Sequence, residues 1–172
     1  EDYLDLDLLQ IYTYSENGKK VLDGERAFIF YTDIHRKYKY PEFDGEKFMT
    51  EAVTWNRMAN DGYIVRYFND IICIYEYLED GLTKAGNKLF LENPKGYGLW
   101  LKEKTLFEKK SILEILKLYY SFYCELYSIY SIGEIADYIN TSKFNMVIVS
   151  IIKKIIDISK NGVKYMKKII IS

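Results

Sequence analysis

The chain has 172 residues, with 24 lysines and arginines against 25 aspartates and glutamates and a formal net charge of −1. This length fits a single domain with a substantial core. The balanced charge excludes a chain that binds nucleic acid or anionic substrates through its overall field, so any partner must be recognised by a local arrangement of side chains.

Cysteine and histidine usage narrows the chemistry further. Cys73 and Cys124 each lie in an apolar run and lack the spacing of a zinc site or a disulfide framework. We therefore expect two reduced, buried thiols in a cytoplasmic protein. His35 is the single histidine, so a catalytic triad or a histidine-rich metal site would depend on this one residue.

The first segment consists of short, punctuated pieces. The chain opens on "EDYLDLDLLQ" without a methionine, so we expect a piece of a longer protein, and an extended run, "LLQIYTYS", follows. The aromatic run "AFIFY" (27–31) has the length and composition of a strand. In "TDIHRKY" a short helix can begin at Thr32 or Asp33, and Pro41 ends it.

After Pro41 the pattern changes to a helix and two strands. Thr50 can cap a helix that runs to about Ala59 and ends at Asp61-Gly62. Strands are expected in "YIVRYF" (63–68) and "IICIYEY" (71–77). The next stretch, "LEDGLTKAGNKLFLENPKGYGLW" (78–100), is rich in Gly, Asn and Asp and predicts a surface loop.

From Lys102 onward the spacing of apolar residues is helical. Residues 101–130 predict one long amphipathic helix. Ser131 and Glu134 form a capping box for a short helix, and residues 140–142 start another that reaches about Ile158. The sequence thus predicts an α/β (α+β) fold, with strands and short helices in residues 1–101 and a helical extension in residues 102–172.

Several ordered motifs in residues 23–83 carry a resemblance to a known family. They are a Gly/Asp turn before a strand, the acidic "PEFDGEKF", an acid heading a helix with Trp and Arg behind it, and "NDIICIYEYLEDGLT". Together these residues resemble the acceptor-side half of a family 2 glycosyltransferase of the GT-A fold. The resemblance covers roughly a third of the chain and implies that the nucleotide-binding half lies outside it.

The resemblance implies a role for Glu51. In such enzymes the acid at the head of this helix is the general base that removes the proton of the acceptor hydroxyl, which must lie within hydrogen-bond reach. A helix N-terminus keeps a carboxylate ionised. The alternative is that Glu51 is an ordinary first-turn acid. Asp44 and Glu46 are rival acids in a stretch that reads as an exposed loop.

Four further residues are candidates for substrate binding. Trp55 lies one turn from Glu51 on the same helix face, where it either belongs to the core or presents a ring to a sugar. Arg57 lies on another face and either pairs with an acid of the loop or binds a diphosphate. Glu79 and Asp80 match a loop near the donor site, and are otherwise a solvated turn.

The resemblance also implies a divalent metal, Mg²⁺ or Mn²⁺, held by an Asp-x-Asp in the nucleotide-binding half. Asp5 and Asp7 have that spacing, but no β-α-β nucleotide pocket precedes them. We therefore expect this chain to bind no metal and to be inactive alone. The implied partners of the complete enzyme are a nucleotide-sugar donor and a glycan or lipid-linked acceptor.

The helical end supports an alternative from another class. Residues 131–158 have the outline of a helix-turn-helix within a noncatalytic interaction domain, although the second helix offers few cations and nucleic acid is not the expected partner. The same helices either pack as a cap or lay an apolar face, with lysines beside it, on the inner face of a membrane. Those lysines are Lys153, Lys154, Lys167 and Lys168. A homo-oligomer is left open.

Overall fold

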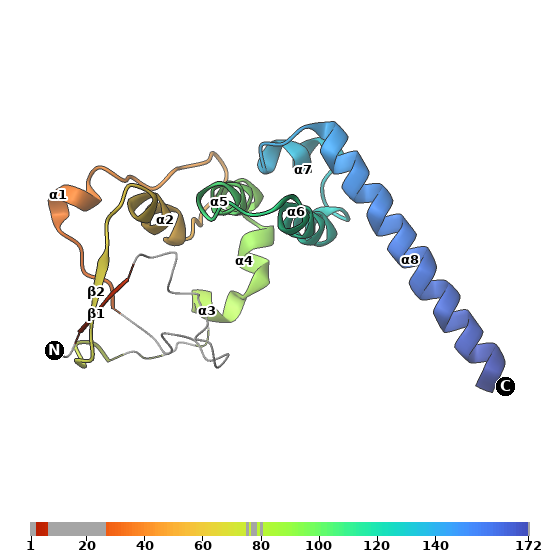
Figure 1. Ribbon diagram of the computed structural model, residues 1–172, viewed down its shortest axis with the longest axis horizontal. Coiled ribbons are helices and arrows are strands. Elements are labelled where there is room, and N and C mark those ends of the chain that lie inside the picture. The colour runs from red at the N-terminus through yellow and green to blue at the C-terminus, as the bar shows by residue number, and fades with distance from the viewer. Residues whose placement is uncertain (1–2, 7–26, 75, 77–78, 80, 172) are drawn as a thin grey trace.

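The computed structural model describes residues 3–6, 27–74, 76, 79 and 81–171, and it is mostly helical with one small sheet (Figure 1). The strands are β1 (Tyr3–Leu6) and β2 (Val65–Phe68), and the helices are α1 (Thr32–His35), α2 (Ala52–Asn60), α3 (Leu82–Ala85), α4 (Asn87–Leu91), α5 (Pro94–Phe107), α6 (Ile112–Leu126), α7 (Ile132–Tyr138) and α8 (Lys143–Ile171). The mixed α+β character expected from the sequence is therefore confirmed.

The sheet joins the beginning of the chain to the segment after α2. β1 and β2 are antiparallel, with Tyr3 opposite Phe68 and Leu6 opposite Val65. Arg66 donates from Nε and Nη2 to the Asp5 carboxylate at 2.8 and 2.6 Å, which fixes this register. The predicted strand in residues 63–68 is confirmed, while the extended run "LLQIYTYS" lies outside the described residues.

Two predicted strands are wrong. Residues 71–74 form no strand, and Ile71 and Ile74 are 94% and 93% exposed, because no third strand among the described residues pairs with this segment. Residues 27–31 also form no strand, since Phe28 and Phe30 pack on Trp55 instead of joining the sheet. Cys73 is exposed with its neighbours, so its expected burial is wrong too.

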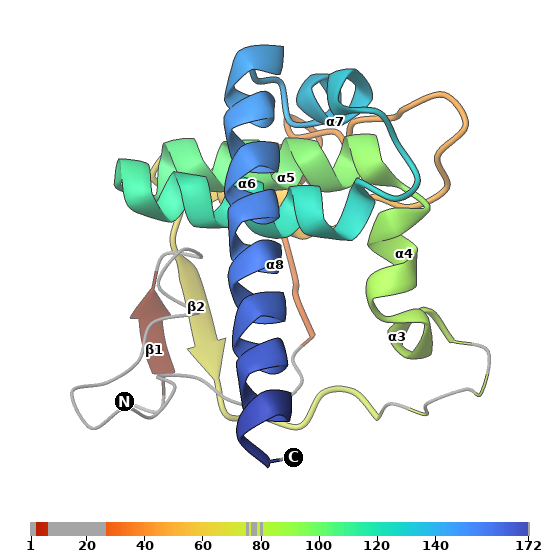
Figure 2. The same ribbon diagram turned by 90° about the vertical axis from the view of Figure 1, so that its right-hand side faces the viewer.

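Helix α5 lies at the centre of the helical layer. It packs against α2 on one side and against α6 and α7 on the other, and α8 then covers α6 and α7 (Figures 1 and 2). The side chains that meet there are apolar and almost fully buried. They include Leu101, Phe122, Leu126, Ile135, Ile139, Met146 and Val149.

The predicted loop at residues 78–100 is wrong, because it contains α3, α4 and the first half of α5. Pro94 occupies the first turn of α5, where its missing N–H costs nothing. Gly98 allows a close approach: a Cβ there would lie 2.1 Å from the Tyr138 carbonyl oxygen. Gly98 is therefore a sign of helix packing and not of a loop. The predicted boundary between the segments 1–101 and 102–172 falls inside α5.

The single long helix predicted over residues 101–130 is also wrong. α5 ends at Phe107, and Lys109 adopts a left-handed backbone with φ of 47°. α6 then begins with a capping box in which Glu114 N donates to Ser111 Oγ at 3.4 Å and Ser111 N donates to Glu114 Oε2 at 2.9 Å. The motif "SILE" carried this signal.

The start signals of α7 and α8 are confirmed, whereas the N-cap residue of α2 is Glu51 and not the predicted Thr50. Ala52 N donates to Thr50 Oγ1 at 3.4 Å, and the Ser131–Glu134 capping box is present at the head of α7. Asn145 N donates to Ser142 Oγ at 3.2 Å at the head of α8, which runs beyond the expected Ile158. Within the part of the chain that is described, no helix combines the length and apolar character needed to cross a membrane.

We predict that Gly98→Ala destabilises the protein by at least about 2 kcal/mol, because its methyl group would overlap the α7 backbone. Gly133→Ala in α7 is the matched control, since the nearest atom to its Cβ is Ser131 Oγ at 3.9 Å. That change should leave stability unchanged or raise it by up to about 1 kcal/mol. Urea unfolding measures both, and equal effects would contradict the close approach of α5 and α7.

The two capping boxes predict a dependence of stability on pH. The pKa of Glu114 is lowered by hydrogen bonds from Ser111, chiefly from its side chain and next from its backbone N–H. The pKa of Glu134 is lowered by hydrogen bonds from Ser131, chiefly from its backbone N–H and next from its side chain. Their stabilising contribution is therefore present above the ordinary value of 4.5 and is lost as the pH falls through the lowered, folded-state values.

Urea unfolding at neutral pH and well below pH 4.5 measures this loss. The double variant Ser111→Ala/Ser131→Ala should flatten the acid dependence, because each glutamate then loses a donor. An unchanged slope in that variant would show that other carboxylates cause the acid sensitivity.

Candidate functional site

The loop that leads into α2 places Glu51 at the helix terminus. Glu46 N donates to the Phe43 carbonyl at 3.0 Å, closing a turn in which Gly45 has φ of +82°. Glu51 is the N-cap residue of α2 and is exposed, and its side chain makes no capping hydrogen bond. The structure therefore places the carboxylate where the sequence predicted it.

The neighbouring acid, Glu46, has a different task. Its Oε1 accepts from Lys95 N at 2.7 Å and its Oε2 accepts from Gly96 N at 2.9 Å. These are two of the N–H groups that the first turn of α5 leaves without an intrahelical partner. Glu46 is thus a cap for α5 supplied from a distant part of the chain, so the expected exposed position is wrong for Glu46, while Asp44 is exposed.

A buried asparagine completes this attachment. Asn93 Oδ1 accepts from the backbone N–H groups of Lys47 and Phe48 at 2.7 and 3.1 Å, and its Nδ2 donates to the Leu89 carbonyl at 2.7 Å. Gly96 leaves room for the loop, since a Cβ there would lie 3.0 Å from Met49 Cε. The loop before Glu51 is therefore held firmly against α5.

Trp55 lies one turn after Glu51 and belongs to an aromatic cluster. Its ring stacks on Phe28 with centroids 4.0 Å apart and lies 6.4 Å from Phe30. The indole Nε1 is buried and has no hydrogen-bond partner among the described residues. A buried donor without a partner costs about 1–3 kcal/mol, so the stabilising contribution of this tryptophan comes from its ring contacts and not from its N–H group.

The aromatic cluster continues toward the carboxylate. The His35 ring lies 5.1 Å from Phe30 and 6.0 Å from Tyr40. Burial, and then the nearby charge of Glu51, raise the pKa of Tyr40. We call Phe28, Phe30, His35, Tyr40 and Trp55 the aromatic row. Sequence reasoning missed this row, because "AFIFY" read as a strand whose side chains would face a sheet.

Arg57 is held away from Glu51. Its Nε donates to both carboxylate oxygens of Glu103 in α5 at 3.0 Å, and its Nη2 donates to Glu103 Oε1 at 2.6 Å. Glu103 is only 14% exposed, so the pair joins α2 to α5 with little screening by solvent. Of the two roles expected for Arg57, the structure shows an ion pair, although with an acid of a helix.

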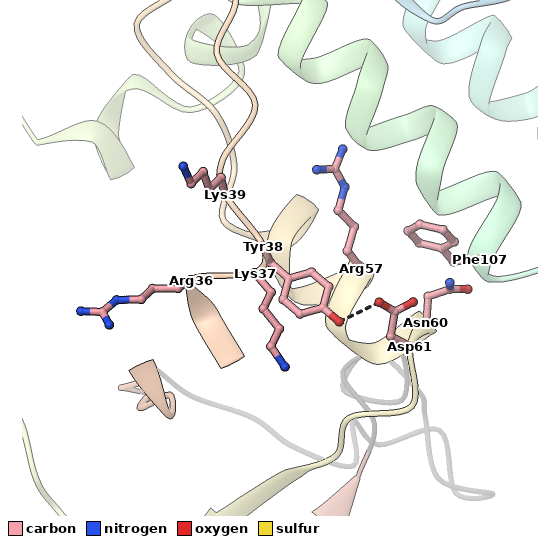
Figure 3. Close-up of a pocket in the computed structure, with 8 residues that line it drawn as sticks. All are labelled: Arg36, Lys37, Tyr38, Lys39, Arg57, Asn60, Asp61 and Phe107. Carbon is pink, nitrogen blue, oxygen red and sulfur yellow. Dashed lines mark hydrogen bonds between the residues drawn. The ribbon is translucent and has the colours of Figure 1, made fainter. Parts of the chain in front are cut away.

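Arg57 also lines a pocket of about 460 Å³ at the carboxyl end of α2 (Figure 3). Tyr38 donates from its hydroxyl to Asp61 Oδ2 at 2.6 Å, and this hydrogen bond raises the pKa of Tyr38 to about 12. The other lining residues are Arg36, Lys37, Lys39, Asn60 and Phe107. The lining thus combines cations with the Asp61 carboxylate, and Glu51 does not line the pocket.

The structure describes two of the remaining candidates, Glu79 and Asp5, and neither lines the pocket or belongs to the aromatic row. Glu79 is exposed, and Asp80 and Asp7 lie outside the described residues. The Asp5 carboxylate is engaged by Arg66, whose hydrogen bond lowers its pKa, so it does not fit the role of a metal ligand. Among the side chains that are described, no group of three His, Cys, Asp or Glu residues is arranged to hold a metal ion.

The predicted helix-turn-helix corresponds to α7 and α8. Met146 and Val149, in the first turns of α8, are fully buried against the domain, while Phe144 is 72% exposed. Phe144 thus gives the exposed side of this helix an apolar group. Recognition of DNA base edges requires hydrogen-bonding side chains on that side, so this feature does not favour DNA binding.

No known protein family, curated protein or solved structure matches this chain. Its function must therefore be inferred from the geometry of its own residues.

We predict unequal effects on the free energy of unfolding for substitutions of Glu46 and Glu51. Glu46→Gln should lower the free energy of unfolding by about 1 kcal/mol, because a neutral amide caps the α5 N–H groups less well than a carboxylate. Glu51→Gln should change it by less than about 0.5 kcal/mol, because Glu51 is exposed and makes no capping bond. Thermal and urea unfolding test this, and equal losses would contradict the assignment of Glu46 as the structural acid.

Proposed function

We propose that this chain is the acceptor-binding part of an inverting glycosyltransferase of the GT-A type, in which Glu51 is the general base. One observation carries the proposal: an exposed carboxylate stands at the head of a firmly anchored helix with the aromatic row beside it. The nearest rival acid with a fixed position, Glu46, already accepts two backbone hydrogen bonds.

The proposed chemistry is a single displacement. The acceptor hydroxyl donates a hydrogen bond to Glu51, and its oxygen attacks the anomeric carbon of the donor sugar. The new carbon–oxygen bond forms as the bond to the diphosphate oxygen breaks, the proton passes to Glu51, and the configuration is inverted.

The aromatic row supplies a surface for the acceptor. Sugar rings present C–H faces that pack on aromatic rings, and their hydroxyl groups hydrogen-bond at the edges. Tyr40, at 38% exposure, is the member next to Glu51, and its hydroxyl is able to orient an acceptor. Trp55, which belongs to α2, supports the row through its stack on Phe28. Arg57 has no part in this step because its guanidinium group is bound to Glu103.

The donor belongs to the other half of the proposed enzyme. A nucleotide sugar and a divalent Mg²⁺ or Mn²⁺ would be held by residues outside this chain, in keeping with the engagement of Asp5 by Arg66. The metal would neutralise charge on the departing diphosphate.

The test uses the full natural protein in which this sequence occurs. UDP-, GDP- and dTDP-sugars are titrated with Mn²⁺ by calorimetry, and transfer is then followed with the donor that binds. We expect Glu51→Gln to lower kcat by about 10²- to 10⁴-fold while donor affinity is unchanged. Asp44→Asn is the matched control, an exposed acid of the same loop that should keep full turnover.

Two results would reject the proposal. One is a full-length protein that binds none of the donors. The other is transfer that continues undiminished in Glu51→Gln, which would leave Glu51 as an ordinary acid at a helix terminus.

A noncatalytic interaction domain is the second candidate. It is favoured by the apolar side chains that α8 leaves exposed, because an exposed apolar surface is typical of a binding interface and has no role in the proposed transfer step. A domain of this kind would bind its partner equally well with glutamine at position 51.

A further inference from the structure

Helix α8 has two apolar faces, and only one of them is covered. Met146, Val149 and Ser150 are buried where the helix packs on α6 and α7. On the other side a row of large apolar side chains is exposed to solvent, between 38% and 72% of each. We call this row the isoleucine stripe, and it consists of Phe144, Ile148, Ile151, Ile155 and Ile158.

The spacing of the stripe keeps it on one side of the helix. Its members are four, three, four and three residues apart, which places them in line along an α-helix. In the sequence the same spacing continues at Gly162, Tyr165 and Ile169, within the bounds of α8. Figure 1 shows the carboxyl-terminal part of α8 projecting away from the other elements. A contiguous exposed apolar row on a projecting helix indicates a surface that binds a membrane or another molecule.

Charge is segregated in the same helix. Between Lys143 and Ile171 the sequence has seven lysines and one aspartate, a formal charge of +6, whereas the rest of the chain carries −7. Lys143 and Lys154 are exposed and lie along one edge of the stripe. Lys153 is on the opposite side, where it pairs with Asp157 and lies 4.2 Å from the centre of the Tyr127 ring. The lysines beside the stripe are therefore the ones free to meet an anionic surface.

The combination of stripe and charge selects among possible occupants. Two copies of α8 joined along the stripe would bring lysines to the joint with no acid beside the stripe to pair with them, because the one aspartate of α8, Asp157, pairs with Lys153 on the opposite side, and this opposes a dimer. A nucleic acid would satisfy the lysines but would set the isoleucines against phosphates. A bilayer with anionic headgroups satisfies both, because apolar side chains enter the acyl boundary while lysines remain at the headgroups.

We propose that α8 is a membrane-surface helix that binds anionic lipid bilayers through the isoleucine stripe. The helix lies parallel to the bilayer, with α6 and α7 on its water side. The face that Met146 and Val149 bury in the domain is opposite the stripe, so binding requires no unfolding of the core.

Vesicle sedimentation with the full chain tests this proposal without any sugar donor or acceptor, so its outcome does not depend on the transferase activity. Vesicles of phosphatidylcholine alone are compared with vesicles that also contain phosphatidylglycerol. We expect binding to the mixed vesicles that weakens with added salt, and at least tenfold weaker binding to phosphatidylcholine alone. Lys154→Gln should reduce binding to the mixed vesicles about fivefold.

The variant that removes the apolar contact is Ile151→Ser/Ile155→Ser. It should lower the partition coefficient on mixed vesicles by about tenfold or more, because two side chains no longer enter the bilayer. The control is Ile71→Ser/Ile74→Ser, which removes two isoleucines outside α8 that are more exposed than Ile151 and Ile155, and it should bind as the wild type does. Circular dichroism melts establish that both variants are folded, as is expected for exposed positions.

Three outcomes would overturn the proposal. The first is no binding to anionic vesicles, and the second is equal loss of binding in the two double variants. The third is a wild-type dimer in sedimentation equilibrium that becomes a monomer in Ile151→Ser/Ile155→Ser while vesicles are ignored, which would assign the stripe to a second copy. Binding to duplex DNA in place of vesicles would count against it in the same way.

Discussion

The carboxylate of Glu46 at the amino end of α5 is the contact on which the arrangement of this protein depends. It accepts hydrogen bonds from two N–H groups of α5, 49 and 50 residues further along the chain, and Asn93 Oδ1 accepts two more from backbone N–H groups of the same loop. Because α5 packs on α2, α6 and α7, this attachment sets the position of the loop relative to the whole helical layer. The free energy involved is modest, but the geometric consequence extends to Glu51, which follows the loop directly.

Two further contacts keep α5 in this central role, and each uses a different kind of interaction. On one side the Arg57–Glu103 ion pair fixes α2 by hydrogen bonds in a partly shielded place. On the other side Gly98 meets the α7 backbone with no side chain between them. The first contact is an ion pair, and the second requires a residue that has no side chain. Together they explain how a candidate site made from a short loop and a nine-residue helix stays ordered.

Local signals in the sequence were sufficient where the cause of structure is local. The helix starts at Ser131 and Ser142 follow from side chains that cap the next turn, and both are confirmed. The start of α2 was predicted to within one residue, since its N-cap residue is Glu51 and not Thr50. Non-local causes were missed. Residues 78–100 read as a loop because Gly98 and Pro94 are ambiguous until their packing partners are known, and Phe28 read as part of a strand because its partner, Trp55, is far along the chain. The position of Glu51 was predictable, whereas the commitment of Glu46 and the aromatic row required the fold.

The separation of charge between α8 and the rest of the chain has a consequence for how the molecule moves. A net charge of −1 conceals a +6 helix at one end and a −7 remainder, so the protein carries a large permanent electric dipole moment along its length. A molecule of this kind has almost no net electrophoretic drift, yet an electric field exerts a torque on it. Within about one Debye length, roughly 8 Å at physiological ionic strength, a negatively charged wall would rotate it until α8 leads. The molecule would therefore be oriented before it touches the surface, with the end that carries Glu51 directed toward the aqueous phase.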